Sequence, residues 1–189
     1  MKLAVLVSGT GSILEAIFEA GISVGVVVAD RPCLAVEKAN LMGLNSEIVL
    51  RDSFHSTFNR IGYTQKLTKV LEEAKIDLVA MSGFGTILES PIHNRYPGRI
   101  LNTHPSLLPA FPGWDAVQDA LSHGVKVTGC TIHQASLEVD AGPILAQKAV
   151  PVLPGDDVKS LHDRIKFEER HLYVEVIQQV ISEYTVGTL

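Results

Sequence analysis

The sequence predicts an α/β fold, in which helices flank a Rossmann-like, mostly parallel sheet and the C-terminal part contains an antiparallel hairpin. Three observations support this prediction. Over the first hundred residues, short apolar runs alternate with helix-like segments. These runs are apolar at nearly every position, which is typical of parallel strands that are covered on both faces. Farther along, two longer β-like runs flank a loop with Gly and Pro, which favours a hairpin over another crossover.

The first half of the chain is expected to hold five strands and three helices. Gly21 and Gly43 follow the first two helices and end them, because glycine readily takes the left-handed backbone found just beyond a helix. In chain order, the expected strands cover residues 3–7, 22–29, 47–50, 78–81 and 100–103, and the helices cover residues 12–20, 34–42 and 63–74.

The second half has a different character. Pro105, Pro109 and Pro112 interrupt regular structure after the fifth strand. The elements expected beyond them are a helix over residues 114–122, strands over residues 125–134 and 144–152 around a loop, and a helix over residues 158–182. Asp156 and Asp157 precede the last helix, and their charge suits the positive N-terminal end of a helix.

Length and composition indicate a single globular domain, residues 1–189. Hydrophobic residues make up 46% of the chain and charged residues 20%, as in ordinary globular proteins. The net charge of −5 provides no basic field for a nucleic acid. Cys33 and Cys130 lie far apart without metal-ligand spacing, and no apolar stretch is long enough to span a bilayer. We therefore expect a cytoplasmic protein with no metal, no membrane and no nucleic acid among its partners.

A glycine-containing turn joins the first strand to the first helix, with the sequence Ser-Gly-Thr-Gly-Ser at residues 8–12. The free N–H groups at a helix start can bind an anion, and we expect phosphate to be the ligand. Leu14 stands where a dinucleotide fingerprint has its third glycine, so Asp30 after the second strand only imitates the ribose-binding acid of that fingerprint. A plain tight turn without a ligand explains the same residues equally well.

Polar side chains mark the end of the fifth strand, in the sequence Asn-Thr-His-Pro-Ser-Leu-Leu-Pro from Asn102. Asn102 and His104 are two residues apart, so their side chains point to the same face of the strand. An amide donor beside an imidazole can stabilise an oxyanion, and the imidazole can exchange a proton near neutral pH. A structural histidine at a strand end is the alternative.

A carboxylate lies on the loop of the hairpin, in the sequence Asp-Ala-Gly-Pro-Ile from Asp140, with His133 shortly upstream. Such a loop can bring Asp140 over a strand end, where it could accept a proton beside His104. Read alone, the same sequence is also a good turn. The three motifs are specific only together and in this order.

Together the three motifs resemble the phosphoribosylglycinamide formyltransferases of purine synthesis, and the similarity runs over nearly the whole chain. The stretch Ala-Phe-Pro-Gly at residues 110–113, and residues 124–129 with Thr131 and His133, fit the same family. The resemblance implies the formyltransferase fold. Residues 1–100 would bind the phosphate and the acceptor, and residues 101–189 would supply catalysis and folate binding.

The resemblance also implies an activity, in which the amine of glycinamide ribonucleotide attacks the formyl carbon of 10-formyltetrahydrofolate. Asn102 and a protonated His104 would steady the oxyanion, and Asp140 would accept or relay the amine proton. The acceptor would meet Gly9, Thr10, Gly11, Ser12, Ile13, Pro105, Lys166 and Glu169. The folate would meet Arg60, Phe84, Gly85, Thr86, Ile87, Leu88, Ser136, Leu137, Glu138 and Val139. Family members occur as monomers and dimers, so a homodimer is left open.

The chain departs from the family pattern at three places. Ile13 stands where many members have Asn, which removes one side-chain donor from the phosphate loop. Gly85 and Thr86 replace a common Met-Arg pair, which changes the packing expected around the folate. Trp114 and Asp115 replace small polar or His residues, and nothing in the sequence explains that change.

The alternatives are related enzymes and a binding module. A methionyl-tRNA formyltransferase is expected to have a longer chain with a basic C-terminal domain, and a formyltetrahydrofolate deformylase an extra N-terminal domain. A non-catalytic nucleotide-binding module would need the phosphate loop, but it would not need Asn102, His104 and Asp140 together. Without the resemblance, Lys166 and Glu169 would be read as part of a solvated helix face.

Overall fold

A computed structural model describes residues 1–53, 55, 57–185 and 187. The chain forms two compact units, Met1–Leu101 and Asn102–Leu189. Each unit has its own arrangement of strands and helices. None of the helices within the described residues has the length and apolar character needed to cross a membrane.

The first unit contains a parallel sheet with the strand order β3-β2-β1-β4. Its strands are β1 (Leu3–Val7), β2 (Val24–Ala29), β3 (Ser46–Ile48) and β4 (Leu78–Ser82). Every residue of β1 is buried, as are the last five residues of β2. This burial explains the continuous apolar runs in the sequence, because both faces of a central parallel strand are covered.

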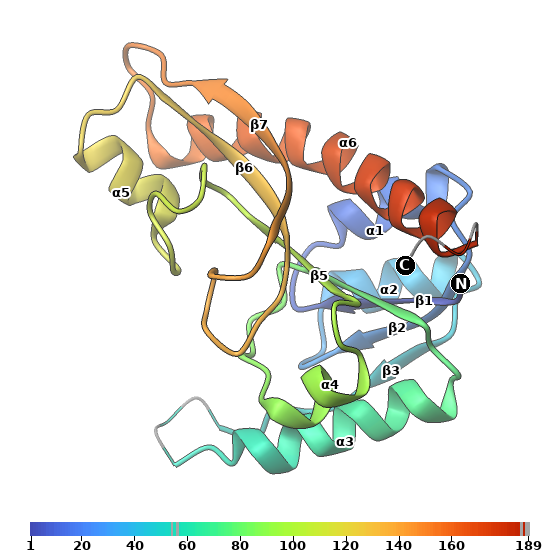
Figure 1. Ribbon diagram of the computed structural model, residues 1–189. Helices are drawn as coiled ribbons and strands as arrows, with labels where there is room; N and C mark the ends of the chain where they lie inside the picture. The colour runs from blue at the N-terminus through green and yellow to red at the C-terminus, as the bar shows by residue number, and fades with distance from the viewer. Residues whose placement is uncertain (54, 56, 186, 188–189) are drawn as a thin grey trace. The chain divides into compact units, whose positions relative to one another are not determined.

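The described residues of the first unit form four helices, which contact one another in pairs. They are α1 (Ser12–Glu19), α2 (Leu34–Leu41), α3 (Arg60–Glu73) and α4 (Ser90–Arg95). α1 contacts α2, while α3 and α4 lie side by side (Figure 1). The sequence predicts no helix at α4, because six residues are too few to show a helical period.

Gly11, between β1 and α1, is required by the local structure. Its φ of 76° lies in the left-handed region. A Cβ on Gly11 would also lie 2.8 Å from the Cβ of Ala35, at the start of α2. Glycine therefore serves both the turn and the close approach of two helices. These structural demands hold whether or not the turn binds a phosphate.

Within its described part, the second unit contains the strand order β5-β6-β7 and two helices. Its elements are β5 (Ile100–His104), α5 (Ala116–Ser122), β6 (Val127–Gln134), β7 (Ile144–Pro151) and α6 (Val158–Thr185), where β5 begins in the last two residues of the first unit. β6 and β7 pair antiparallel, and α6 packs against both of them (Figure 1). The predicted parallel sheet and C-terminal hairpin are both confirmed.

The core of the second unit lies between the hairpin, α5 and α6. Cys130 of β6 and Val150 of β7 pack with Leu161 and Ile165, which are four residues apart on α6 and completely buried. Val117 of α5 closes the cluster. The spacing of four residues places both α6 side chains on one face of the helix, as the apolar pattern of the sequence predicts.

The start of α6 is capped by the acidic residues that precede it. Asp157 Oδ1 accepts a hydrogen bond of 2.7 Å from the backbone N–H of Ser160, and the Ser160 hydroxyl accepts one of 3.0 Å from the Asp157 N–H. This reciprocal pair is a capping box. The bond from the Ser160 N–H is the main cause that lowers the pKa of Asp157 below its ordinary value. Asp156 instead forms an ion pair with Arg164.

Several predicted bounds differ from the structure by one to three residues, for a physical reason. Ile22 and Val125 are β-like residues that follow Gly21 and Gly124, but their N–H groups bond back to Ile17 and Ala120 of the preceding helices. They therefore complete the helix ends, and the strands begin two residues later. At the start of α3, Asn59 Oδ1 accepts from the Gly62 N–H at 2.9 Å, so this helix begins three residues earlier than predicted.

Candidate active site

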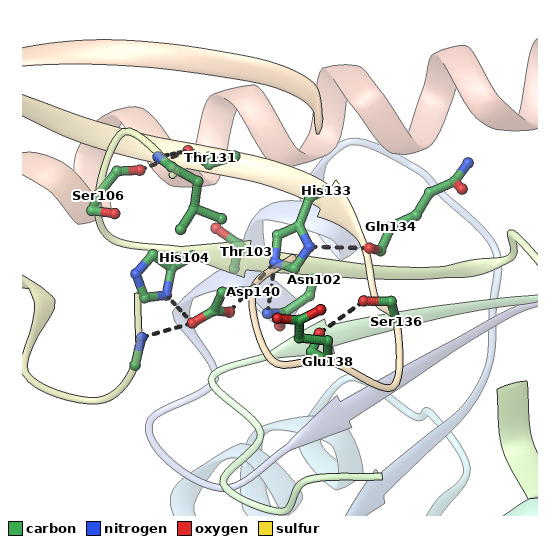
Figure 2. A network of polar contacts seen from close by, with 12 residues as sticks. Asn102, Thr103, His104, Ser106, Thr131, His133, Gln134, Ser136, Glu138 and Asp140 are labelled. Atoms are coloured by element: carbon green, nitrogen blue, oxygen red, sulfur yellow. Dashed lines mark hydrogen bonds and ion pairs between the residues drawn. The ribbon is translucent and has the colours of Figure 1, made fainter. Parts of the chain in front are cut away.

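The last residues of β5 carry the predicted pair of polar side chains. Asn102 and His104 point to the same side of the strand, where the hairpin loop meets them (Figure 2). Thr103 lies between them and donates a hydrogen bond of 2.6 Å to Glu169 of α6 instead. The alternation follows from the strand period of two, which sends successive side chains to opposite faces.

Asp140 is held in place by an unusual backbone. Its φ is 56°, in the left-handed region that non-glycine residues rarely adopt. The loop around it is tightly packed, since a Cβ on Gly142 would lie 1.8 Å from the carbonyl oxygen of Gln134. Strained conformations of this kind persist where the surrounding structure fixes them, and they cluster at functional sites.

The carboxylate of Asp140 lies between two histidines, as Figure 2 shows. Its Oδ2 is 3.3 Å from Nδ1 of His104 and accepts a hydrogen bond of 2.8 Å from the backbone N–H of Gly113. Its Oδ1 is 3.7 Å from Nε2 of His133. All three charged or polar side chains are almost completely buried. The predicted grouping of Asn102, His104 and Asp140 thus occurs within the second unit.

His104 faces an acceptor at each ring nitrogen. Nε2 donates to the carbonyl oxygen of Phe111 at 2.8 Å, and Nδ1 faces Asp140. A neutral imidazole has only one N–H and leaves one of these acceptors without a donor, whereas the imidazolium donates to both. Both acceptors are therefore satisfied together only by a ring that carries a proton on each nitrogen.

His133 faces a different pair of partners. Nδ1 is 3.1 Å from the carbonyl oxygen of Gln134, and Nε2 is 3.1 Å from the amide nitrogen of Asn102. A carbonyl only accepts and an NH₂ group only donates, so the neutral tautomer with a proton on Nδ1 satisfies both. Burial lowers the pKa of His133, although the bond to Gln134 and the charge of Asp140 oppose the shift. The neutral form of His133 therefore orients the Asn102 amide.

The sequence gives His133 no role of its own, although it lies at the centre of this cluster. A signal was present, because Thr131 and His133 are two apart on β6, as Asn102 and His104 are on β5. Only the pairing of β5 beside β6 shows that the polar ends of these two strands meet.

Glu169, which the resemblance assigns to the acceptor, is buried on α6. Only 8% of the residue is exposed, so it does not belong to a solvated helix face. Burial raises its pKa, while the hydrogen bond from Thr103 and the charges of Lys166 and Arg170 act in the opposite direction. Lys166, one turn earlier on α6, is half-buried.

The predicted phosphate loop lies in the first unit, between β1 and α1. Gly9, Thr10 and Gly11 form the turn, and α1 begins at Ser12. Ile13 is 6% exposed and packs in the core, so its side chain offers little surface to a ligand. The N–H groups at the start of α1 are the donors that this loop can offer to an anion.

The residues expected to bind the folate lie on loops of both units. Residues 84–88 follow β4, and the side chains of Phe84, Thr86 and Leu88 are buried there. Arg60 is exposed at the first position of α3. Ser136, Leu137, Glu138 and Val139 form the hairpin loop before Asp140, where Leu137 and Val139 are exposed. Pro105 directly follows β5.

The cluster of Asn102, His104, His133 and Asp140 can perform acyl-transfer chemistry. An amide N–H and an imidazolium can stabilise negative charge on a carbonyl oxygen, and a carboxylate beside them can take a proton. No group of three His, Cys, Asp or Glu side chains that could hold a metal ion occurs among the residues described.

Known proteins with related sequences point to the same chemistry. The model of a family described as formyl transferase matches residues 1–177. The phosphoribosylglycinamide formyltransferase of Mycobacterium tuberculosis is 44% identical over 181 residues, which cover 93% of this chain and 83% of that protein. The trifunctional purine biosynthetic protein adenosine-3 of Homo sapiens is 38% identical over 96% of this chain, but the chain spans only 18% of that protein's length.

Solved structures agree with these sequence relationships. The phosphoribosylglycinamide formyltransferase from Streptococcus pneumoniae superimposes with a TM-score of 0.88 and is 36% identical. The match covers 95% of this chain and 98% of that one.

Proposed function

Because the chain belongs to the formyl transferase family, we propose that it transfers the formyl group of 10-formyltetrahydrofolate to the amine of glycinamide ribonucleotide, a step of purine biosynthesis. The chain is a one-carbon transferase, and its formyl donor is a folate derivative. One observation supports the proposal most directly. The Asp140 carboxylate lies 3.3 Å from His104 and 3.7 Å from His133, next to Asn102 at the end of β5.

Asn102 and His104 act on the formyl oxygen. As the amine attacks, the oxygen gains negative charge, which the Asn102 amide stabilises by donating a hydrogen bond. His133 holds that amide through one of its N–H bonds, so the other remains for the oxyanion. His104 supplies positive charge beside the same oxygen. These groups are already oriented before reaction, which removes the cost of arranging them in the transition state.

Asp140 handles the proton that the attacking amine must lose. Before the attack, its carboxylate stabilises the charge on His104. The carboxylate then accepts the amine proton, directly or through a water molecule, and passes it to the folate nitrogen, which leaves as its bond to the formyl carbon breaks. The Gly113 N–H fixes the carboxylate in place at 2.8 Å. In this way one buried carboxylate serves both as a proton acceptor and as the partner of the imidazolium.

The acceptor is held at its two ends. N–H groups of Gly9, Thr10, Gly11, Ser12 and Ile13 bind the phosphate at the start of α1. Lys166 and Glu169 bind the ribose and glycinamide part, with Pro105 beside it. The burial of Glu169 and its hydrogen bond from Thr103 support this assignment, because a buried carboxylate with a fixed orientation is suited to recognition.

The folate is held mainly by backbone groups. Residues 84–88 of the first unit and residues 136–139 of the second are the proposed contacts of its pterin ring, and Arg60 is the proposed contact of its glutamate tail. The inward side chains of Phe84, Thr86 and Leu88 support a role for the backbone of their loop, since these side chains are not directed to solvent.

A spectrophotometric assay with the purified protein tests the proposal. The donor, 10-formyltetrahydrofolate or its dideaza analogue, is supplied with and without glycinamide ribonucleotide. Donor consumption that requires the ribonucleotide and disappears in His104→Ala is the expected result. Donor consumption without the acceptor would identify a hydrolase instead. Binding of either ligand without any turnover would identify a binding module.

A further inference from the structure

Asp30, at the end of β2, is fully buried and carries a charge that the proposed reaction does not use. Arg31 Nε and Nη2 donate to its two oxygens at 2.9 and 3.1 Å. The hydroxyl of Thr86 donates to Oδ2 at 2.9 Å. Both carboxylate oxygens thus have protein donors, which explains why Asp30 resembles a ribose-binding acid only in sequence.

The loop that contains Thr86 is fixed at three further points, all within the first unit. The Gly85 N–H donates to the Ser8 hydroxyl at 2.8 Å, and the Gly85 carbonyl accepts from Arg51 at 3.1 Å. The N–H of Glu89, just beyond the loop, donates to the Thr64 hydroxyl at 3.1 Å. Ser8 is the first residue after β1, so one set of contacts joins the loops that follow β1, β2 and β4.

We propose that Asp30 and Thr86 are positioning residues for the formyl donor: their buried hydrogen bond holds the backbone of residues 84–88 in the conformation that binds the folate. The inference rests on the proposed function, which places the donor on this loop. Neither side chain touches the donor, because Asp30 is 0% and Thr86 1% exposed. They act through the backbone between Phe84 and Leu88.

The hydrogen bond from Thr86 to Asp30 also determines whether a buried charge keeps all its donors. Burial raises the pKa of Asp30, but the hydrogen bonds from Arg31, Ser8 and Thr86 together lower it by more. The pKa of Asp30 therefore lies below its ordinary value. Asp30 therefore remains charged at neutral pH. A buried charge that loses one of its donors is costly, so the loop is strongly biased to the conformation that keeps Thr86 in place.

Thr86→Val tests this role, because valine keeps the shape and removes the donor. Thr86→Ser restores the hydroxyl. The matched control is Thr68→Val on α3, which also removes a buried hydroxyl of the first unit, bonded at 2.8 Å to the carbonyl oxygen of Thr64. We expect Thr86→Val to raise the KM of the formyl donor by at least about fivefold, the effect of one lost hydrogen bond to a charged group. The KM of glycinamide ribonucleotide should change by less than about twofold, and Thr86→Ser should recover the donor KM.

Amide hydrogen exchange tests the positioning itself, whatever the enzyme's activity. Exchange across residues 84–89 should accelerate in Thr86→Val and in Asp30→Asn, but not in Thr68→Val. The inference is overturned if Thr86→Val leaves exchange of this loop unchanged, or if Thr68→Val alters the donor KM equally. Absence of acceptor-dependent transfer in the wild-type protein would refute the proposed function alone, and the exchange result would still decide the role of Asp30 and Thr86. If Thr86→Val does not fold, Asp30→Asn and Thr86→Ser decide by the same comparison.

Discussion

Asp140 combines a left-handed backbone, with φ of 56°, and a buried carboxylate that faces two histidines. The two histidines differ because their partners differ. His104 has acceptors at both ring nitrogens, whereas His133 has one acceptor and one donor. At the scale of single residues, the site is therefore defined by which atoms face each other and not by residue type alone.

Asp140→Asn separates the chemistry from the fold. Asparagine tolerates the left-handed backbone, and its amide oxygen can accept from the Gly113 N–H. It cannot take the proton of the amine, so kcat should fall by about 10²- to 10⁴-fold. Thermal denaturation should show a melting temperature close to that of the wild type. A variant that keeps full turnover would exclude Asp140 as the proton acceptor.

The protonation state of His133 is open to direct measurement. Since burial lowers its pKa below 6.5, His133 should remain neutral at pH 7 with the proton on Nδ1. Nitrogen-15 NMR of labelled histidine distinguishes this tautomer from the other neutral form and from the imidazolium. Assignment through His133→Gln identifies the signal. A signal from a doubly protonated His133 at pH 7 would contradict the orientation assigned to Asn102.

At the scale of elements, the sequence predicts the strands and long helices because their patterns are local. β1 is apolar at every position, and α6 carries apolar residues at helical spacing. The short helix α4 was missed, since six residues show no period. The ordered motifs predict that Asn102, His104 and Asp140 lie together, as they do. The motifs do not predict the contact of His133 with Asn102 or the bond from Thr103 to Glu169, because both depend on contacts between distant elements.

The start of α3 provides a test of an element boundary. Asn59 caps this helix through a hydrogen bond of 2.9 Å from Gly62, and the helix begins at Arg60, three residues before the predicted start. Asn59→Ala should lower the free energy of unfolding by about 1 kcal/mol, and Asn59→Asp should preserve most of it. Urea denaturation followed by circular dichroism measures both. Equal stability of the alanine variant and the wild type would show that the cap is dispensable.

The packing of α6 provides a second test at this scale. Leu161 is completely buried against β6, β7 and α5. Leu161→Ala removes buried methyl groups and leaves a cavity, so it should cost about 3 kcal/mol of unfolding free energy. Phe167→Ala on the same helix is the control, because Phe167 is 56% exposed. A larger loss in the control than in Leu161→Ala would contradict the assigned core.

At the scale of the whole molecule, one buried and two half-buried histidines should make stability depend on pH. Burial lowers the pKa of His93, His133 and His162 below 6.5. As the pH falls through 6.5, the unfolded chain takes up protons before the folded one, so the free energy of unfolding should decrease. Glu169 has the opposite effect on the free energy of unfolding at lower pH. Burial raises its pKa above 4.5, so the folded chain takes up this proton before the unfolded chain does.

Thermal melts between pH 7 and pH 5 measure this dependence. The melting temperature should fall over that range, and His162→Gln should weaken the fall. A melting temperature that rises as the pH is lowered from 7 to 5 would contradict the assigned burial of these histidines.

Under the proposed function, the whole molecule delivers a formyl group to an amine and not to water. A donor labelled with carbon-13 in its formyl group tests this claim most directly, with glycinamide ribonucleotide present and the products observed by NMR. The label should appear in the formamide of the ribonucleotide, and His104→Ala should abolish its transfer. Label recovered as free formate, with the ribonucleotide unchanged, would contradict the proposed function.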